Sequence, residues 1–199
     1  MPLAHKKVTL LSGENRSRGA VLGVIAIGAA VSAAKAGGNT GTGALTLDVT
    51  TPVRAGAKVG VYRVRCIAAA ANSGTFRVED PDGIVLGDVV VGGTFDDDLK
   101  FAIADGGTDF IVDDGFDITV AAGSGKVKLS AAAAVDGSAI PDLILAEACD
   151  ASAGDKEALV YTRGDFNQNS LTFGAGHTAA TVRDILRAKG INLVNVKGA

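Results

Sequence analysis

Residues 61–84 read VYRVRCIAAAANSGTFRVEDPDGI and carry the clearest pattern in the chain. Tyr62, Val64 and Cys66 alternate with arginines, and Phe76 and Val78 alternate with charged residues in the second half. A period of two is typical of strands that bury one face. The DPDG sequence that follows is a turn signal, because proline presets φ and glycine accepts the positive φ that closes a hairpin. This stretch therefore predicts a β-hairpin rather than a helix.

The same alternation continues in short segments from residue 44 to about residue 130. These further segments are Leu45–Val49, Leu99–Ile103, Phe116–Val120 and Val127–Leu129. Several short strands separated by glycine- and aspartate-rich turns are typical of a β-sandwich or barrel. We therefore expect one β-domain over residues 44–130.

Two other parts flank this domain. Residues 1–36 contain a basic start and an apolar run, and they end at GGNTGTG (residues 37–43), which has the composition of a linker. Residues 131–199 contain mixed turns and short strands, of which LILAEA and ALVYTRG are the clearest. The pattern thus predicts three parts joined by a linker at residues 37–43.

One short helix is expected near the C-terminus. Thr178 can cap it, Val182, Ile185 and Leu186 form an apolar stripe at helical spacing, and Gly190 ends it. Residues 191–196 (INLVNV) follow as a final strand. With the strands described above, this helix predicts a mainly β (α+β) class.

The apolar run from Ala20 to Ala34 has two alternative interpretations to a strand, a membrane segment and a targeting segment. Its fifteen residues would span about 22 Å as a helix, which is short of the roughly 30 Å hydrocarbon core of a bilayer. The polar sequence SGENRSRG ahead of it does not fit a secretion signal. We expect a buried strand followed by an alanine-rich linker, and no membrane partner.

Composition excludes several classes of protein. The net charge of −3 gives no basic excess for direct nucleic-acid binding. Two widely separated cysteines form neither a disulfide framework nor a metal-binding motif, so a reducing compartment is expected. Large apolar side chains are few, with seven Phe, two Tyr and no Trp, so we expect a modestly stable monomer that gains stability by oligomerisation.

Two groups of residues could carry chemistry. The first is a cluster of aspartates, Asp96, Asp97, Asp98, Asp105, Asp109, Asp113, Asp114 and Asp117. Calcium prefers six to eight oxygen ligands, but the cluster lacks the twelve-residue loop with a closing glutamate, and solvated turns are the expected alternative. The second is His177, which could pair with Cys149 or Ser170, although a lone histidine beside a helix cap is more often a packing residue. We therefore expect no metal, cofactor or catalytic site.

The C-terminal third resembles the bacteriophage head decoration protein family. The matching residues are YTRGDFN at 161–167, LTF at 171–173, His177-Thr178 and RAKGI at 187–191. The family shares a G-x-F-N segment, a short helix and a Leu-Arg-x-x-Gly-Ile ending, and its phage lambda member has an RG-containing strand near the N-terminus. The positions that carry the resemblance here are Arg18, Gly19, Gly164, Phe166, Asn167, Gly190 and Ile191.

This resemblance implies an architecture. A small decoration core would be built from residues 1–36 and 131–199 together, and residues 44–130 would be an inserted β-domain, as in longer prophage members of the family. The resemblance gives no role to the inserted domain.

The resemblance also implies a structural function without catalysis. Family members bind the outside of the expanded capsid as trimers at threefold and quasi-threefold positions and stabilise it against internal DNA pressure. The implied partners are the major capsid protein and two further copies of the chain. The protein would be made in the host cytoplasm and end on the outer surface of the virion.

An N-terminal arm that orders on the capsid would correspond to residues 1–13 here. Its predicted capsid contacts are Pro2, Leu3, His5, Lys6, Lys7, Val8 and Leu10. A segment of this kind can add a strand to a capsid sheet, where main-chain hydrogen bonds supply affinity.

Two other functions remain open from the sequence. A tail or fibre-associated adhesion module would bind a host glycan through residues 44–130. A hydrolase would depend on His177.

Overall fold

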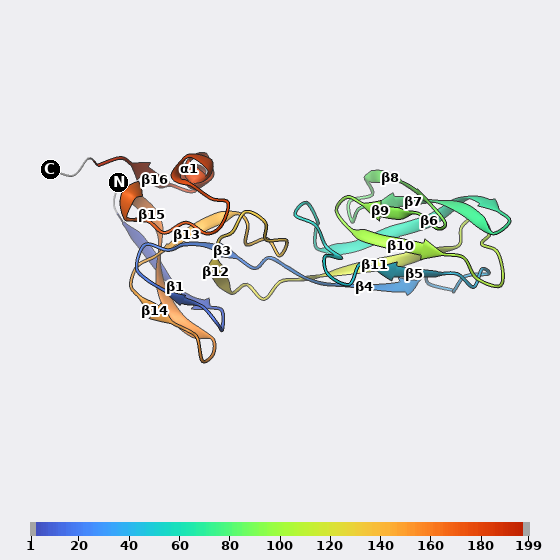
Figure 1. Ribbon diagram of the computed structural model, residues 1–199, viewed down its shortest axis with the longest axis horizontal. Helices are drawn as coiled ribbons and strands as arrows, with labels where there is room; N and C mark the ends of the chain where they lie inside the picture. Colours follow the sequence, from blue (N-terminus) through green and yellow to red (C-terminus); the bar gives the residue numbers. More distant parts are fainter. Residues whose placement is uncertain (1–2, 197–199) are drawn as a thin grey trace. The chain divides into compact units, whose positions relative to one another are not determined.

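The computed structural model describes residues 3–196, and the chain divides into two compact units. Unit 1 combines the residues up to Ala26 with those from Gly123 onward, and unit 2 is the continuous segment Ile27–Ala122. Strands dominate both units, and the described residues contain a single α-helix, which confirms the mainly β class (Figure 1).

The main sheet of unit 1 closes on itself. Its strands are hydrogen-bonded in the order β1 (Ala4–Leu10), β12 (Val127–Leu129), β3 (Val21–Val24), β13 (Pro141–Leu145) and β15 (Lys156–Asn167), and β15 pairs with β1 again. β16 (Ile191–Val194) runs parallel to the last residues of β15, and β2 (Asn15–Arg16) pairs with β14 (Cys149–Asp150) as a separate short ribbon. Closure into a barrel satisfies backbone groups that would otherwise lie at a sheet edge.

Alternation along these strands separates two hydrophobic cores. Leu22, Leu143 and Leu145 point into the barrel and pack with Leu10. Val21 and Ile144, which adjoin them in sequence, belong to a second core outside the barrel. Because successive side chains of a strand point to opposite faces, β3 and β13 contribute to both cores.

The C-terminal helix covers the outer core. α1 (Ala179–Ala188) begins after Thr178, whose side chain accepts a hydrogen bond from the backbone N–H of Thr181. Val182 and Leu186 are fully buried against β13 and β16. The predicted cap is confirmed, as is the end of the helix, where Gly190 adopts a φ of +82°. Ile185 is 37% exposed, so the buried stripe is narrower than predicted.

Unit 2 contains two sheets. The large sheet has the order β4 (Ile27–Ala34), β11 (Gly115–Ala122), β6 (Gly60–Ala70), β7 (Ser73–Glu79) and β8 (Val85–Val90). The small sheet has the order β5 (Ala44–Leu47), β10 (Lys100–Ala104) and β9 (Thr94–Asp96). All pairings within both sheets are antiparallel.

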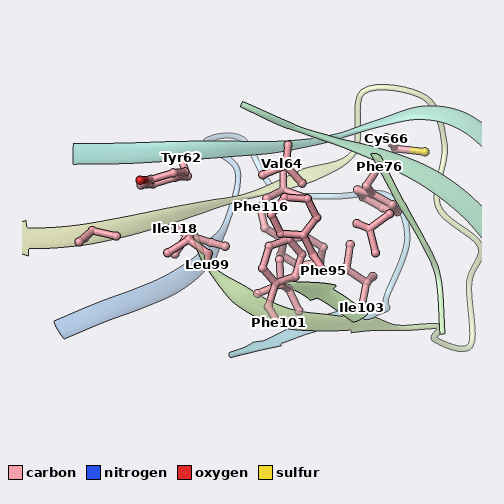
Figure 2. Close-up of a cluster of buried hydrophobic side chains, with 14 of the residues drawn as sticks. Tyr62, Val64, Cys66, Phe76, Phe95, Leu99, Phe101, Ile103, Phe116 and Ile118 are labelled. Atoms are coloured by element: carbon pink, nitrogen blue, oxygen red, sulfur yellow. The ribbon is translucent and has the colours of Figure 1, made fainter. Parts of the chain in front are cut away.

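A single hydrophobic cluster joins the two sheets of unit 2 (Figure 2). Its aromatic members are Tyr62, Phe76, Phe95, Phe101, Phe110 and Phe116, all of them buried. Phe76 meets Phe110 edge-on at 4.9 Å between ring centroids, and Phe95 stacks on Phe101 at 5.2 Å. Burying one such side chain stabilises a fold by about 1.5–3 kcal/mol. The few large side chains of the chain are therefore concentrated in unit 2 rather than spread thinly over the whole protein.

The predicted hairpin between β7 and β8 is present. The Asp80 carboxylate accepts hydrogen bonds from the backbone N–H groups of Asp82 (2.9 Å) and Ile84 (2.8 Å), and Gly83 takes a φ of +82°. The Lys58 ammonium donates to the same carboxylate and, with these N–H groups, lowers the pKa of Asp80 below its ordinary value. The turn is thus closed by its own first aspartate.

The boundaries between the two units differ from those predicted from the sequence, which lay at residues 36/37 and 130/131. Residues 27–34 form β4 of the large sheet rather than an alanine-rich linker, and β12 belongs to unit 1 because it pairs with β3. Residues 37–43 also lie within unit 2: the N–H groups of Thr40 and Gly41 donate to Asp114. Composition suggested a linker because a tightly held glycine-rich loop and a flexible one have the same residue types.

Candidate functional site

A groove of about 380 Å³ lies on unit 1. It brings together the residue just before β1, the loop before β3, β13, and the segment from β15 to Leu171. The lining residues are Leu3, Arg18, Gly19, Ile144, Leu145, Tyr161, Asp165, Phe166, Asn167, Ser170 and Leu171. Four residues predicted from the family resemblance, Arg18, Gly19, Phe166 and Asn167, therefore meet at one place although nearly 150 positions separate them in the sequence.

Gly19 joins the two walls of this groove. It has a φ of +88°, and a Cβ placed there would lie 2.5 Å from the carbonyl oxygen of Ser170. Its N–H donates to Leu145 O at 2.8 Å, and its carbonyl accepts from the N–H of Thr172 at 3.0 Å. Both the backbone conformation and the close approach require glycine at this position.

The other residues predicted for the core hold the segment after β15 in place. Gly164 donates to Gly190 O at 3.0 Å and pairs with Ile191, which is fully buried. Phe166 packs against Tyr161 at a centroid distance of 5.2 Å. The side chain of Asn167 accepts a hydrogen bond from the N–H of Asn169 and caps the 3-10 turn Gln168–Ser170. These are structural roles.

Arg18 differs from the other groove residues. Its side chain is exposed, and its guanidinium makes no hydrogen bond or ion pair with any residue in the described part of the chain. Leu3, 56% exposed, lies at the same groove. An unpaired cation beside an exposed leucine and the half-buried rings of Tyr161 and Phe166 makes a surface that can bind a protein segment.

The predicted N-terminal arm is a strand of the protein's own barrel. Residues Ala4–Leu10 pair along their whole length with β15, for example Lys6 with Val160. Leu10 is fully buried and Val8 packs into the barrel core, so these two side chains are not available to a partner. The alternation of Val8 and Leu10 was the sequence signal for a core strand.

The remaining arm residues are accessible. His5, Lys6 and Lys7 are exposed, and Lys7 forms an ion pair with Glu157 at 2.6 Å. Pro2 lies outside the described residues. The accessible residues of the predicted contact are therefore Leu3, His5, Lys6 and Lys7, of which Leu3 lines the groove.

His177 does not meet either of the nucleophiles considered for it. Its Nε2 lies 2.9 Å from Ala139 O and 3.3 Å from Ser130 Oγ. A carbonyl oxygen only accepts, so Nε2 carries the hydrogen and cannot take a proton from Ser130. Ser130 is fully buried and itself donates to Ala139 O. The geometry is that of a packing contact.

The aspartates of this cluster have separate structural roles. Asp96 binds Arg54 through both carboxylate oxygens, Asp117 pairs with Arg65, and Asp113 pairs with Lys35. Within residues 3–196 no three His, Cys, Asp or Glu side chains are placed to hold a metal ion. The clustering in sequence reflects turns that each need a carboxylate.

Asp114 accepts the most backbone hydrogen bonds of these aspartates. It is buried and accepts backbone hydrogen bonds from Thr40 (2.8 Å), Gly41 (2.8 Å) and Ile111 (3.0 Å). Burial opposes its charge, but the N–H groups outweigh burial and lower the pKa of Asp114 below its ordinary value. This carboxylate ties the 37–43 loop to the start of β11.

Ile144 and Leu145 were predicted as part of the LILAEA strand but not as groove residues. They reach the groove through the pairing of β13 with β3 and β15, which the local pattern does not specify. The described residues include no helix long and apolar enough to cross a bilayer.

Comparison with solved structures gives two similar chains. Both are crystal structures of Xanthomonas campestris FlgL, at 22% and 21% identity, covering 53% and 60% of this chain with TM-scores of 0.34 and 0.33. The matches take in 33% and 32% of the FlgL chains, so this chain spans about a third of their length. At these TM-scores the likeness supports no conclusion about fold or function.

A search of curated proteins gives no match. The family model described as bacteriophage lambda head decoration protein D, in contrast, matches residues 2–191, nearly the whole chain. That range includes the Arg18-Gly19 loop, the G-x-F-N segment and the Gly190-Ile191 ending that meet in unit 1. The chain belongs to the phage lambda head decoration protein family.

Proposed function

We propose that the protein binds the outer surface of the expanded phage head as a homotrimer at threefold and quasi-threefold positions. There it contacts the major capsid protein and stabilises the shell against internal DNA pressure. The observation that carries this proposal is the family match over residues 2–191, which makes the chain a phage head component. It is made in the host cytoplasm and has a structural role without catalysis.

The groove and the open edge of β1 are the surfaces we assign to the capsid. On one side β1 pairs with β15 throughout, whereas on the other side, among the described residues, only Leu10 is paired with a strand, β12. The N–H of Leu11 donates to Val127 O on that side, so by alternation the backbone groups of His5 and Lys7 point there too, and no described strand pairs with them. An extended segment of the major capsid protein could add there by β-augmentation and continue past Leu3 into the groove.

The binding test uses heads that lack decoration protein. Purified protein is expected to co-sediment with expanded heads of the phage that encodes it and to raise the temperature at which they release DNA. It is not expected to bind unexpanded heads. Failure to bind expanded heads, with unchanged heat resistance, would overturn the proposed function.

Replacing Lys7 with proline tests the role of the β1 edge. The N–H of Leu11 donates to Val127 on the open side, so by alternation the N–H of Lys7 points to that side as well. Lys7→Pro removes this donor. The hydrogen bonds to β15 are made by the even-numbered residues of β1 and are retained. We expect head affinity to fall roughly tenfold, equivalent to about 1.4 kcal/mol. Lys7→Ala removes the Glu157 ion pair but keeps the N–H. Equal binding by both variants would argue against strand addition at this edge.

The glycan-binding alternative lacks support in unit 2. Small-molecule sites are lined mainly by apolar and aromatic side chains. All aromatic side chains of unit 2 belong to its buried cluster, so none is presented to a sugar.

A further inference from the structure

β4 is the edge strand of the large sheet in unit 2, and one of its two sides is unpaired. Its partner is β11, with Ala33 opposite Asp117 and Val31 opposite Thr119. Within residues 3–196 no strand pairs with the other side of β4. An unpaired strand edge is a template for another strand.

The register shows which backbone groups are free. The N–H of Lys35 donates to Gly115 O at 2.9 Å, so the odd-numbered residues of β4 direct their backbone groups to β11. By alternation the N–H and C=O groups of Ala30, Ser32 and Ala34 point away from the sheet. Their side chains are small, and no described residue donates to or accepts from these backbone groups.

Residues 30–34 of β4 lack the features that protect the other edges. The sequence of β4, IGAAVSAA, contains no charged residue and no proline over eight residues. The opposite edge, β8, carries Asp88 and a register shift, and the edges of the small sheet are strands of four and three residues. In unit 1, β1 carries two lysines. Charges, bulges and short strands are the usual means of preventing edge-to-edge pairing. β4 has no charge, and its register shift against β11 lies at its start, between Ile27 and Ala30, so residues 30–34 form a regular, uncharged edge.

We propose that β4 is an interface between two copies of this chain, in which it pairs antiparallel with itself about Val31. In this register Ala30 of each copy exchanges hydrogen bonds with Ser32 of the other, using the groups that point outward. Val31, 65% exposed, lies opposite its own copy in a non-hydrogen-bonded pair. The large sheets of the two copies become continuous.

The sequence of β4 favours its own copy as the occupant. An uncharged strand offers nothing to steer a charged partner, whereas pairing about a twofold axis needs only a strand that is complementary to itself. Lys35 directly follows β4 and is the nearest charged residue. In the paired strands, the Lys35 residues of the two copies lie at opposite ends of the strand pair. The Lys35 ammonium is already neutralised by Asp113 at 2.9 Å. The interface uses unit 2 alone and does not depend on the proposed trimer or on capsid binding by unit 1.

A charge at Val31 tests the pairing. Because the twofold axis passes beside this residue, Val31→Lys places two lysines opposite each other and is expected to weaken self-association at least tenfold. Val90→Lys is the matched control, since Val90 is 54% exposed on the opposite edge strand of the same sheet. Sedimentation velocity of the full chain from micromolar to millimolar concentration measures both. Wild type and Val90→Lys are expected to double in mass with concentration, and Val31→Lys is not.

Two further measurements separate strand pairing from other contacts. Ser32→Pro removes an outward N–H without touching the β11 ladder, and it is expected to abolish the doubling while circular dichroism stays unchanged. Hydrogen exchange is expected to slow at the amides of Ala30, Ser32 and Ala34 as concentration rises. Absence of concentration-dependent doubling in the wild type, or doubling that persists in both Val31→Lys and Ser32→Pro, would overturn the proposal. A trimer through unit 1 would set the starting mass and present three β4 edges. Any growth in mass beyond that starting value, lost in Val31→Lys and Ser32→Pro, therefore reports the β4 pairing, and the two proposals fail separately.

Discussion

Replacing Asp114 with alanine is expected to lower the free energy of unfolding of unit 2 by about 3 kcal/mol or more and to leave unit 1 folded. The substitution leaves the N–H groups of Thr40, Gly41 and Ile111 without their acceptor. Leaving the buried donor of Gly41 unpaired costs about 1–3 kcal/mol, and the part-buried donors of Thr40 and Ile111 add to this cost. Asp109→Ala is the control, because Asp109 is exposed and accepts one backbone N–H, from Asn72, so its loss is expected to cost about 0.5–1.5 kcal/mol.

The chain provides a separate reporter for each unit. It has no tryptophan and two tyrosines, Tyr62 in unit 2 and Tyr161 in unit 1. In a Tyr161→Phe background, tyrosine fluorescence during urea unfolding therefore follows unit 2 alone. If Asp114→Ala and Asp109→Ala shift the midpoint equally, the buried carboxylate is not the determinant of loop stability that we describe.

The same carboxylate gives unit 2 a dependence on pH. Because the pKa of Asp114 is lower in the folded state, its contribution to stability is complete above the ordinary carboxyl pKa of about 4 and is lost as the pH falls through the folded value. Asp114→Asn removes this titration, so its unfolding free energy is expected to fall less steeply than that of the wild type below about pH 4.

Removing unit 2 and joining Ala26 to Gly123 through an Asn-Gly turn is expected to leave a folded unit 1 that still binds heads. The N–H of Gly123 donates to Ala26 O at 2.9 Å, and Ile25 exchanges hydrogen bonds with Gly125 and Lys126. The two chain segments already run as an antiparallel ladder where unit 2 leaves, so a two-residue hairpin turn can close it. The barrel core and the α1 core contain no residue of unit 2.

Circular dichroism and head binding check this shortened chain. We expect a cooperative thermal transition within a few degrees of that of unit 1 in the full chain, because the cores are unchanged, and undiminished binding to expanded heads. Gly23→Ala in the shortened chain is the negative control, since the added Cβ would lie 2.0 Å from Ser138 O and prevent β3 and the 138 loop from packing. A shortened chain that is unfolded, while the full chain is folded, would show that unit 1 depends on unit 2.

Local signals in the sequence were sufficient for several elements. The period-two alternation around Tyr62 and Phe76 predicted strands, DPDG predicted the β7–β8 turn, and Thr178 with Gly190 marked the ends of α1. In each case neighbouring residues alone set the conformation, through side-chain periodicity, a capping hydroxyl or a glycine at positive φ.

Several groove residues were predicted from the family motifs, but it was not predicted that they meet in one groove. Arg18-Gly19 and Phe166-Asn167 came from the order of motifs along the chain, and the structure brings them together through the pairing of β13 with both β3 and β15. The N-terminal segment was predicted as a free arm, but the structure pairs it with β15. An amphipathic strand has the same sequence whether its partner lies in its own chain or in another.

The sequence by itself determined the class of the fold, the hairpin at residues 80–83, the single C-terminal helix and, through the order of its motifs, the family. Only the tertiary structure decided that unit 2 begins at Ile27, that residues 37–43 are held by Asp114, that the aromatic residues of unit 2 form one core, and that one side of β4 is left unpaired within residues 3–196. Periodicity, caps and turns act within a few residues and can be read locally. Strand partners, loop anchors and sheet edges depend on segments tens of residues apart, and alternating strands of similar composition do not specify which of them will pair.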